Sequence, residues 1–229
     1  MKMILSVVLA TLLVATGCHQ APKEVETKKI ETNAEEADWE ITVTKPVFSS
    51  TNPELNKQCI PLNEAIGALL GGLEDSLKTD ATALFASLEA DSISRPLWKY
   101  QLFVTDSVFL ATERFISVRL TAYTFTGGAH GMTRFYAFNY DVKNQKLLTP
   151  EEILNYKQQA AIDKQIQSHF RNPEGCFDKQ PTLPLASVIN LNDREVCFTY
   201  EHYILGAYYC GTAEVNVPLD KLKGSVILK

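Results

Sequence analysis

The clearest hydrophobic pattern in the chain is an alternation of apolar and polar residues on both sides of a glycine-rich turn. Apolar side chains recur at every second position from Ile116 to Ala122, and again from Tyr136 to Val142. An alternation with a period of two is typical of a β-strand with one buried face. The pattern therefore predicts a hairpin whose strands flank the turn at residues 126–131.

A helical pattern occupies residues 61–88, where leucine and isoleucine recur at spacings of three, four or seven. A second helix is predicted from Thr149 to about His169, because Thr149, Pro150 and Glu152 form a capping box with proline in the first turn. Further strands are expected at residues 41–48, 98–104, 108–110, 186–191, 195–200 and 212–217, the second and third as a hairpin around 105–107. Together these elements predict an α+β fold with an antiparallel sheet and two longer helices.

Residues 1–17 have the composition of an export signal. One positive charge precedes an apolar run over residues 4–14, and small residues stand directly before Cys18. This order is typical of a lipoprotein signal, so we expect Cys18 to carry lipid and to hold the protein on a membrane. The alternatives are a plain signal peptide or a membrane anchor, although a bilayer span needs roughly 20 residues. In a cell with an outer membrane, His19 favours that membrane, with the protein facing the periplasm.

Residues 18–40 are polar and acidic and show no apolar period. We expect a flexible, lipid-anchored tether there, with an acidic interaction tail as the alternative. The rest of the chain is divided into a strand-helix-strand part at residues 41–112 and a C-terminal domain at residues 113–229. The formal net charge of −5 argues against a nucleic-acid partner, which needs a basic face.

The glycine-rich turn holds the residue that most invites a functional role. Gly127, Gly128 and Gly131 favour backbone angles that other residues resist, and His130 lies among them. A neutral imidazole can act as a base or ligate a metal, but catalysis also needs a positioned partner. The other histidines show no metal-ligand spacing, and the loop opens a strand and not a phosphate-binding helix. We therefore expect His130 to shape the turn, and we expect no metal site and no cofactor.

The turn sequence Thr-Gly-Gly-Ala-His-Gly, together with residues 138–149, resembles the C-terminal domain of RsiV-type anti-sigma factors. That domain also accompanies peptidoglycan deacetylases of the PdaC type and occurs in many bacterial lipoproteins of unknown function. Residues 203–219 are similar to the closing pattern of the family, so the resemblance extends from about Phe115 to the C-terminus. A helix with Asn63 near its start is weakly similar to the usual N-terminal companion of the domain.

The resemblance implies a non-catalytic binding module on the cell envelope, whose partner would be a lysozyme-like muramidase or peptidoglycan. The cytoplasmic segment and membrane span of RsiV-type proteins are absent, which argues against the same anti-sigma mechanism. Tyr203, Tyr208 and Tyr209 are candidate contact residues, because aromatic rings suit both sugars and protein hot spots. For any one of these tyrosines, filling the sheet is the more common role.

Two other functions remain open at this point. An envelope hydrolase would pair His130 with an acid such as Asp141 or Glu201, although the chain has no nucleophile elbow, zinc motif or carboxylate pair. A purely structural lipoprotein would only space or brace the envelope.

Four cysteines remain after Cys18, and an exported chain with an even number permits two disulfides. Cys197 and Cys210 lie on neighbouring predicted strands, whereas Cys59 and Cys176 lie in loops beside helix ends. We predict disulfides within these two pairs, with free buried thiols as the alternative.

Overall fold

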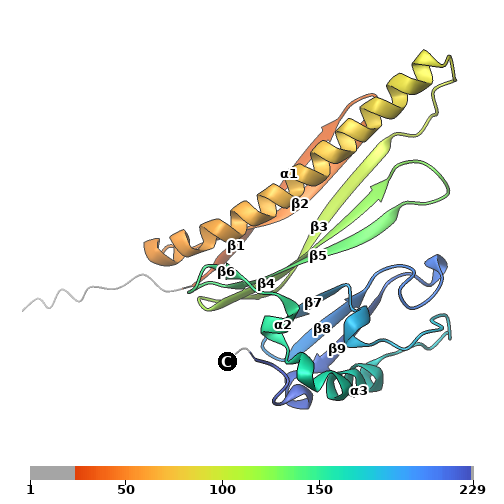
Figure 1. The fold of residues 1–229 in the computed structure, drawn as a ribbon. Coiled ribbons are helices and arrows are strands. Elements are labelled where there is room, and N and C mark those ends of the chain that lie inside the picture. Colours follow the sequence, from red (N-terminus) through yellow and green to blue (C-terminus); the bar gives the residue numbers. More distant parts are fainter. Residues whose placement is uncertain (1–23, 228–229) are drawn as a thin grey trace, which may run out of the picture.

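The computed structural model describes residues 24–227, which form two β-sheets and a long helix α1 (Figure 1). The first sheet has the order β1-β2-β3-β4-β5-β6, and the second has the order β7-β8-β9. Neighbouring strands are antiparallel, except that β2 and β3 are parallel and are connected through α1. The predicted α+β fold is confirmed, but its strands are divided between two sheets.

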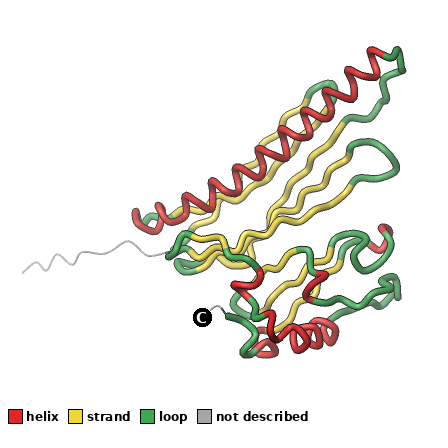
Figure 2. The backbone as a smooth tube through the Cα atoms, in the orientation of Figure 1, coloured by secondary structure: helices red, strands yellow, loops and turns green. Residues whose placement is uncertain are grey.

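The elements have the following bounds. The strands are β1 Glu26–Glu35, β2 Trp39–Ser49, β3 Tyr100–Ala111, β4 Phe115–Phe125, β5 Met132–Asp141, β6 Lys146–Leu147, β7 Val188–Leu191, β8 Glu195–Tyr200 and β9 Ala213–Pro218. The α-helices are α1 Pro53–Ala90, α2 Pro150–Ile153 and α3 Gln159–His169. Figure 2 shows α1 along the first sheet and α3 against the second sheet, which lies between α3 and the first sheet.

Helix α1 begins at Pro53 and not at Pro61, where the sequence pattern placed its start. The Asn52 side chain caps the helix by accepting hydrogen bonds from the backbone N–H groups of Glu54 (3.1 Å) and Leu55 (3.2 Å). Pro53 suits the first turn, where its missing N–H is not needed. The buried face of α1 is made by Leu55, Cys59, Leu62, Ile66, Leu70, Leu77, Ala81 and Phe85.

Residues 26–35 form strand β1, which corrects the prediction of a flexible tether over residues 18–40. β1 pairs antiparallel with β2 along its whole length. All ten of its side chains are exposed, so it has no apolar period that could reveal a strand. Backbone hydrogen bonds to β2, and not burial of side chains, hold this segment in the sheet.

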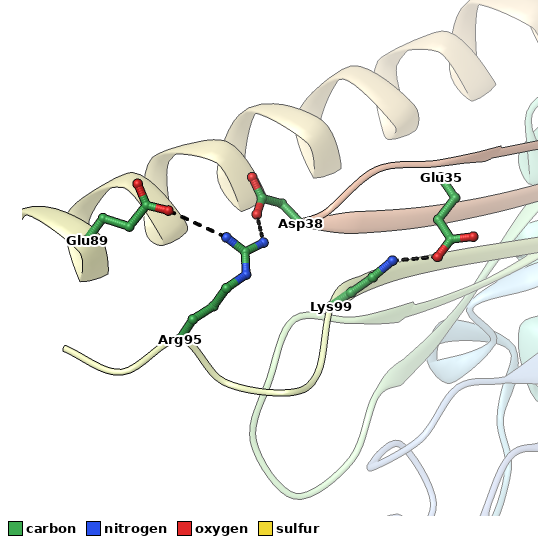
Figure 3. Close-up of polar contacts among 5 residues, drawn as sticks. All are labelled: Glu35, Asp38, Glu89, Arg95 and Lys99. Carbon is green, nitrogen blue, oxygen red and sulfur yellow. Dashed lines mark hydrogen bonds and ion pairs between the residues drawn. The ribbon is translucent and has the colours of Figure 1, made fainter. Parts of the chain in front are cut away.

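Ion pairs fasten the connection between α1 and β3 to the β1–β2 hairpin (Figure 3). Arg95 contacts Asp38 in the β1–β2 turn, and its other terminal nitrogen lies 3.7 Å from Glu89 near the end of α1. Lys99 contacts Glu35, the last residue of β1. These ion pairs therefore connect the C-terminal end of α1 to the turn between β1 and β2.

Residues 100–111 form a single strand, β3, and not a hairpin around residues 105–107. β3 pairs with β4 on both sides of this segment, with a register irregularity between Val108 and Leu110. Strand pairing thus overrides the local turn preference of the polar residues 105–107. Because β3 and β4 are neighbours, the predicted boundary between residues 112 and 113 falls inside the first sheet.

The predicted helix from Thr149 to His169 is interrupted. Its capping box is present, because the Glu152 carboxylate accepts a hydrogen bond from the Thr149 N–H (3.1 Å). The chain then becomes extended at Leu154, which bridges to Val226. Pairing with the C-terminal segment takes the backbone groups that would continue the helix, so α2 ends there and α3 begins at Gln159.

Polar side chains lie buried between the two sheets. Ser117 on β4 donates a hydrogen bond to Asn139 of β5 (2.8 Å) and accepts one from Asn190 of β7 (3.0 Å). Asn139 in turn donates to the backbone carbonyl of Ile189 (2.7 Å). The alternation in β4 predicted one buried face; here the polar face is buried as well, under the second sheet.

Arg119 is a buried cation between the sheets. Its guanidinium donates to Thr199 Oγ1 of β8 (2.7 Å) and pairs with Glu214 of β9 (2.7 Å). The guanidinium also lies over the rings of Phe109 and Phe135, at 5.3 Å and 4.9 Å from their centroids. One side chain from β4 therefore links the central strand β8 and the edge strand β9 of the second sheet to the first sheet.

Candidate functional site

The β4–β5 turn is shaped by its glycines. Gly127 and Gly128 have φ angles of +96° and +89°, a region that favours glycine. A Cβ at Gly127 would lie 2.8 Å from the Trp98 ring, and a Cβ at Gly131 would lie 2.5 Å from the backbone oxygen of Thr124. Gly127 and Gly131 therefore let the turn lie close to Trp98 and to the Thr124 backbone, while Gly127 and Gly128 supply its positive φ angles.

His130 in this turn stacks on a tyrosine from the β8–β9 connection. The rings of His130 and Tyr208 are nearly parallel, with 3.6 Å between centroids. The Tyr208 hydroxyl donates a hydrogen bond to the Gly131 carbonyl (2.7 Å). The structure thus brings together His130 and Tyr208, which are far apart in the sequence.

The second face of Tyr208 is covered by His202, a residue that no sequence motif marks. The two ring centroids are 4.5 Å apart, so His130, Tyr208 and His202 form a three-ring stack. His202 Nδ1 is buried without a hydrogen-bond partner among the described residues. Burial lowers the pKa of His202 below its ordinary value, and nearby His130 lowers it further, while Glu201 opposes the shift. The sequence signal for His202 is its position directly before Tyr203, which was already a candidate contact residue.

Two exposed tyrosines flank the stack. Tyr203 is 53% exposed, and its hydroxyl lies 3.5 Å from His130 Nε2. It has a φ of +68°, a strained angle for a residue with a side chain. Tyr209 is 84% exposed and lines a hollow together with residues 172–177. We call Tyr203, Tyr209 and the three-ring stack the aromatic shelf.

A disulfide between Cys176 and Cys210 anchors the aromatic shelf. It joins the loop at residues 172–177 to the segment that carries Tyr208 and Tyr209. A hollow of about 480 Å³ lies between them, lined by residues 172–177, Tyr209 and Cys210. The exposed tyrosines are therefore presented by a connection that is fastened at its end.

The predicted pairings Cys197–Cys210 and Cys59–Cys176 are wrong. Cys197 faces Asn216 across the β8–β9 pair, whereas Cys210 precedes β9 and turns toward the other loop. Cys59 lies inside α1, which starts earlier than predicted. Both unpaired thiols are buried, and burial raises the pKa of each, that of Cys197 to about 11 with a contribution from Glu214.

The acids considered as partners of His130 have other roles. Asp141 is at the far end of β5, where its carboxylate accepts hydrogen bonds from Asn144. Glu201 accepts a hydrogen bond from the Phe135 N–H (2.9 Å) and pairs with Arg134 (3.3 Å). The hydrogen-bond partners found for His130 within residues 24–227 are the Gly131 carbonyl and the Tyr203 hydroxyl.

Asn63, noted for its place near the start of a helix, has a defined structural role. Its side-chain amide accepts a hydrogen bond from the Phe48 N–H (2.9 Å) and donates one to the Phe48 carbonyl (2.7 Å). The amide therefore mimics a neighbouring strand at the end of β2, beyond the last residue that pairs with β3.

Residues 24–227 contain no group of three or more His, Cys, Asp or Glu side chains that could hold a metal ion. No helix within this range is long and apolar enough to cross a membrane. The predicted signal peptide and the predicted lipid site at Cys18 lie outside the described residues, so both stay predictions.

The fold is similar to that of solved structures, although the sequence matches no protein of curated function. Two solved structures share the fold: a DUF3298 family member from Bacteroides fragilis (TM-score 0.63, 18% identity, 90% of this chain and 94% of that chain) and a DUF3298 family protein from Pseudomonas aeruginosa (TM-score 0.54, 19% identity, 90% and 95%).

A family model described as deacetylase PdaC matches residues 30–133. This segment lies largely upstream of the predicted resemblance, which began at about Phe115. The PdaC part of that resemblance is supported, whereas the RsiV-type part stays a prediction. Residues 30–133 therefore match the PdaC family model, and the chain has the fold of these DUF3298 structures.

Proposed function

We propose that this protein is an exported, lipid-anchored binding module of the cell envelope, and that its aromatic shelf recognises a lysozyme-like muramidase or peptidoglycan. The observation that carries the proposal is the exposure of Tyr203 and Tyr209 on a connection held by a disulfide. Exposed aromatic rings pack against sugar rings and serve as anchors in protein interfaces. A surface fastened before binding loses little conformational entropy on binding.

The place of the aromatic shelf in the molecule supports the same proposal. In Figure 1 the described chain starts at the left, whereas the β4–β5 turn and the β8–β9 connection lie at the right. A protein held to a membrane through its N-terminus would therefore present the shelf on the side away from its attachment. Wall polymers and soluble proteins of the envelope can reach that side.

The surroundings of His130 favour binding over hydrolysis. Its ring is stacked on Tyr208, and its two nitrogens lie next to a carbonyl and a phenol. Neither group can serve as the carboxylate that orients a general base. Glu201, the nearer of the two acids considered, is engaged by Arg134 and the Phe135 N–H.

Titration calorimetry tests this function. The mature chain with Cys18→Ser is titrated with lysozyme and with soluble peptidoglycan fragments. We expect binding to at least one of them and a loss of roughly tenfold or more in affinity for the double variant Tyr203→Ala/Tyr209→Ala. Leu147→Ala is the matched control, since Leu147 is an exposed apolar side chain on β6, at the other end of the first sheet. Absence of binding to both ligands would contradict the proposal, as would equal affinities of the double variant and the control.

A further inference from the structure

The outer edge of β1 is a backbone surface that the fold leaves unpaired. β1 is the first strand in the order of the first sheet, so only one of its edges is bonded, to β2. An unpaired edge of ten residues is a template for another strand. No hydrogen bond from another described element covers this edge.

The edge strand is held in a fixed position. Its last residue, Glu35, contacts Lys99, the residue directly before β3 (Figure 3). Near its middle, Lys29 lies 3.1 Å from the buried carboxylate of Asp106 on β3. An edge that is ordered before association loses less entropy when it pairs with a partner.

We propose that β1 pairs with β1 of a second copy of this chain, antiparallel and about a two-fold axis at Ile30. In this register residue i faces residue 60 − i of the partner. Lys29 then lies opposite Glu31 and Glu31 opposite Lys29, so unlike charges flank a central contact between the two Ile30 side chains, while each Lys29 ammonium keeps its ion pair with Asp106 of its own chain. Ile30 is exposed in the single chain, and the pairing covers it.

Neighbouring registers are less favourable on the same physical grounds. Full overlap of the two strands would place Glu26 opposite Glu35 twice, and like charges directly opposite each other are destabilising. A shift by one residue in the other direction from the Ile30-centred register places Ile30 opposite Lys29. The two Ile30 side chains then lie on opposite faces of the joined sheet and cannot contact each other. In the Ile30-centred register, Thr27 faces Asn33 and Lys28 faces Thr32, which are polar pairs without repulsion.

The helices leave room for this arrangement. α1 packs chiefly against β2 and β3, so it lies at least one strand inward from the free edge. At about 4.8 Å between strands, the β2 strands of the two copies would be about 14 Å apart. Packed helices need only about 8–10 Å between axes, so the two α1 helices do not collide. The predicted lipid at Cys18, eight residues before β1, would also keep two copies on one membrane surface and raise their effective concentration.

Cysteine cross-linking in whole cells that express the full chain tests this pairing. Ile30→Cys places two thiols directly opposite each other across the two-fold axis, at a Cα separation compatible with a disulfide. Thr27→Cys is the matched control, because its equivalent in the partner would be six positions away along the strand, roughly 20 Å. After mild oxidation and non-reducing electrophoresis, we expect a covalent dimer for Ile30→Cys and a monomer for Thr27→Cys. A monomer for both, or equal dimer for both, would overturn the proposal.

A charge variant tests the register independently. Glu31→Lys in the Ile30→Cys background puts lysines opposite each other in both flanking pairs, and we expect a cross-linking yield roughly three- to tenfold lower. Glu31→Gln should lie between that variant and the parent. These exposed positions leave the fold unchanged, which thermal unfolding of each variant verifies. A yield unchanged by Glu31→Lys would refute the proposed register, and capture of another protein or of residues 1–23 by β1 would give monomers throughout.

Discussion

Gly131 shows how a single missing side chain decides the shape of the candidate site. A Cβ at this position would meet the Thr124 backbone and the Tyr123 ring, neither of which can move freely. We predict that Gly131→Ala lowers the free energy of unfolding by about 1–3 kcal/mol through overpacking. Gly72→Ala is the control, since a Cβ there has open space and the helix should gain about 0.5–1 kcal/mol. Urea unfolding measures both, and equal effects of the two substitutions would refute the packing argument.

His202 should make the stability of the folded chain depend on pH. Its pKa is lowered by burial and by His130, so the unfolded chain binds a proton more readily than the folded chain. Stability is therefore full above the ordinary histidine pKa of about 6.5 and falls as pH drops through that value toward the folded pKa.

The measurement is the free energy of unfolding between about pH 7.5 and 5.5, before most carboxylates titrate. We expect a smaller decline in His202→Phe, which keeps a flat ring against Tyr208 but cannot take a proton. A pH profile identical to that of the parent chain would show that His202 does not carry the dependence.

At the scale of elements, the ion pair between β4 and β9 predicts an asymmetry between its two partners. The Arg119 side chain is 8% exposed and that of Glu214 is 43% exposed. Glu214→Ala leaves a buried guanidinium without its carboxylate, which costs about 1–3 kcal/mol. Arg119→Met removes the buried charge and lets Glu214 hydrate, so we expect a smaller loss. Denaturant unfolding measures the loss in the free energy of unfolding for each variant. A larger loss for Arg119→Met than for Glu214→Ala would contradict this account of the interface between the sheets.

The disulfide predicts both reactivity and stability. Alkylation of the unfolded, unreduced chain should label Cys59 and Cys197, whereas Cys176 and Cys210 should be labelled only after reduction. The double variant Cys176→Ser/Cys210→Ser should lose about 3–4 kcal/mol of stability, because the bond closes a loop with a sequence separation of 34 residues. Labelling of Cys210 without reduction, detected by peptide mass spectrometry, would argue against this pairing.

Elements with a periodic apolar face were predictable, and elements placed by backbone pairing without burial of their own side chains were not. β8 and the buried face of α1 follow their hydrophobic patterns, because burial of those side chains is what places them. β1 has no buried side chain, and the break between α2 and α3 depends on pairing with residues near 226. Such long-range backbone contacts leave no local signal in the sequence.

At the scale of the molecule, the sequence indicated which residues are candidates for the site, but it did not indicate which of them contact one another. The glycine turn marked His130, and the cluster of aromatic residues marked Tyr203, Tyr208 and Tyr209. That Tyr208 stacks between His130 and His202 follows from how the β8–β9 connection meets the β4–β5 turn. The disulfide pairing depends on the same long-range geometry, which is why proximity of predicted strands gave the wrong partners.

The most direct test of the proposed binding function is NMR with isotope-labelled tyrosine rings, recorded while lysozyme or peptidoglycan fragments are added. We predict that the ring resonances of Tyr203 and Tyr209 shift with ligand concentration, while those of Tyr140, buried against α1, stay in place. Resonances of Tyr203 and Tyr209 that do not move at saturating concentrations of either ligand would contradict the account.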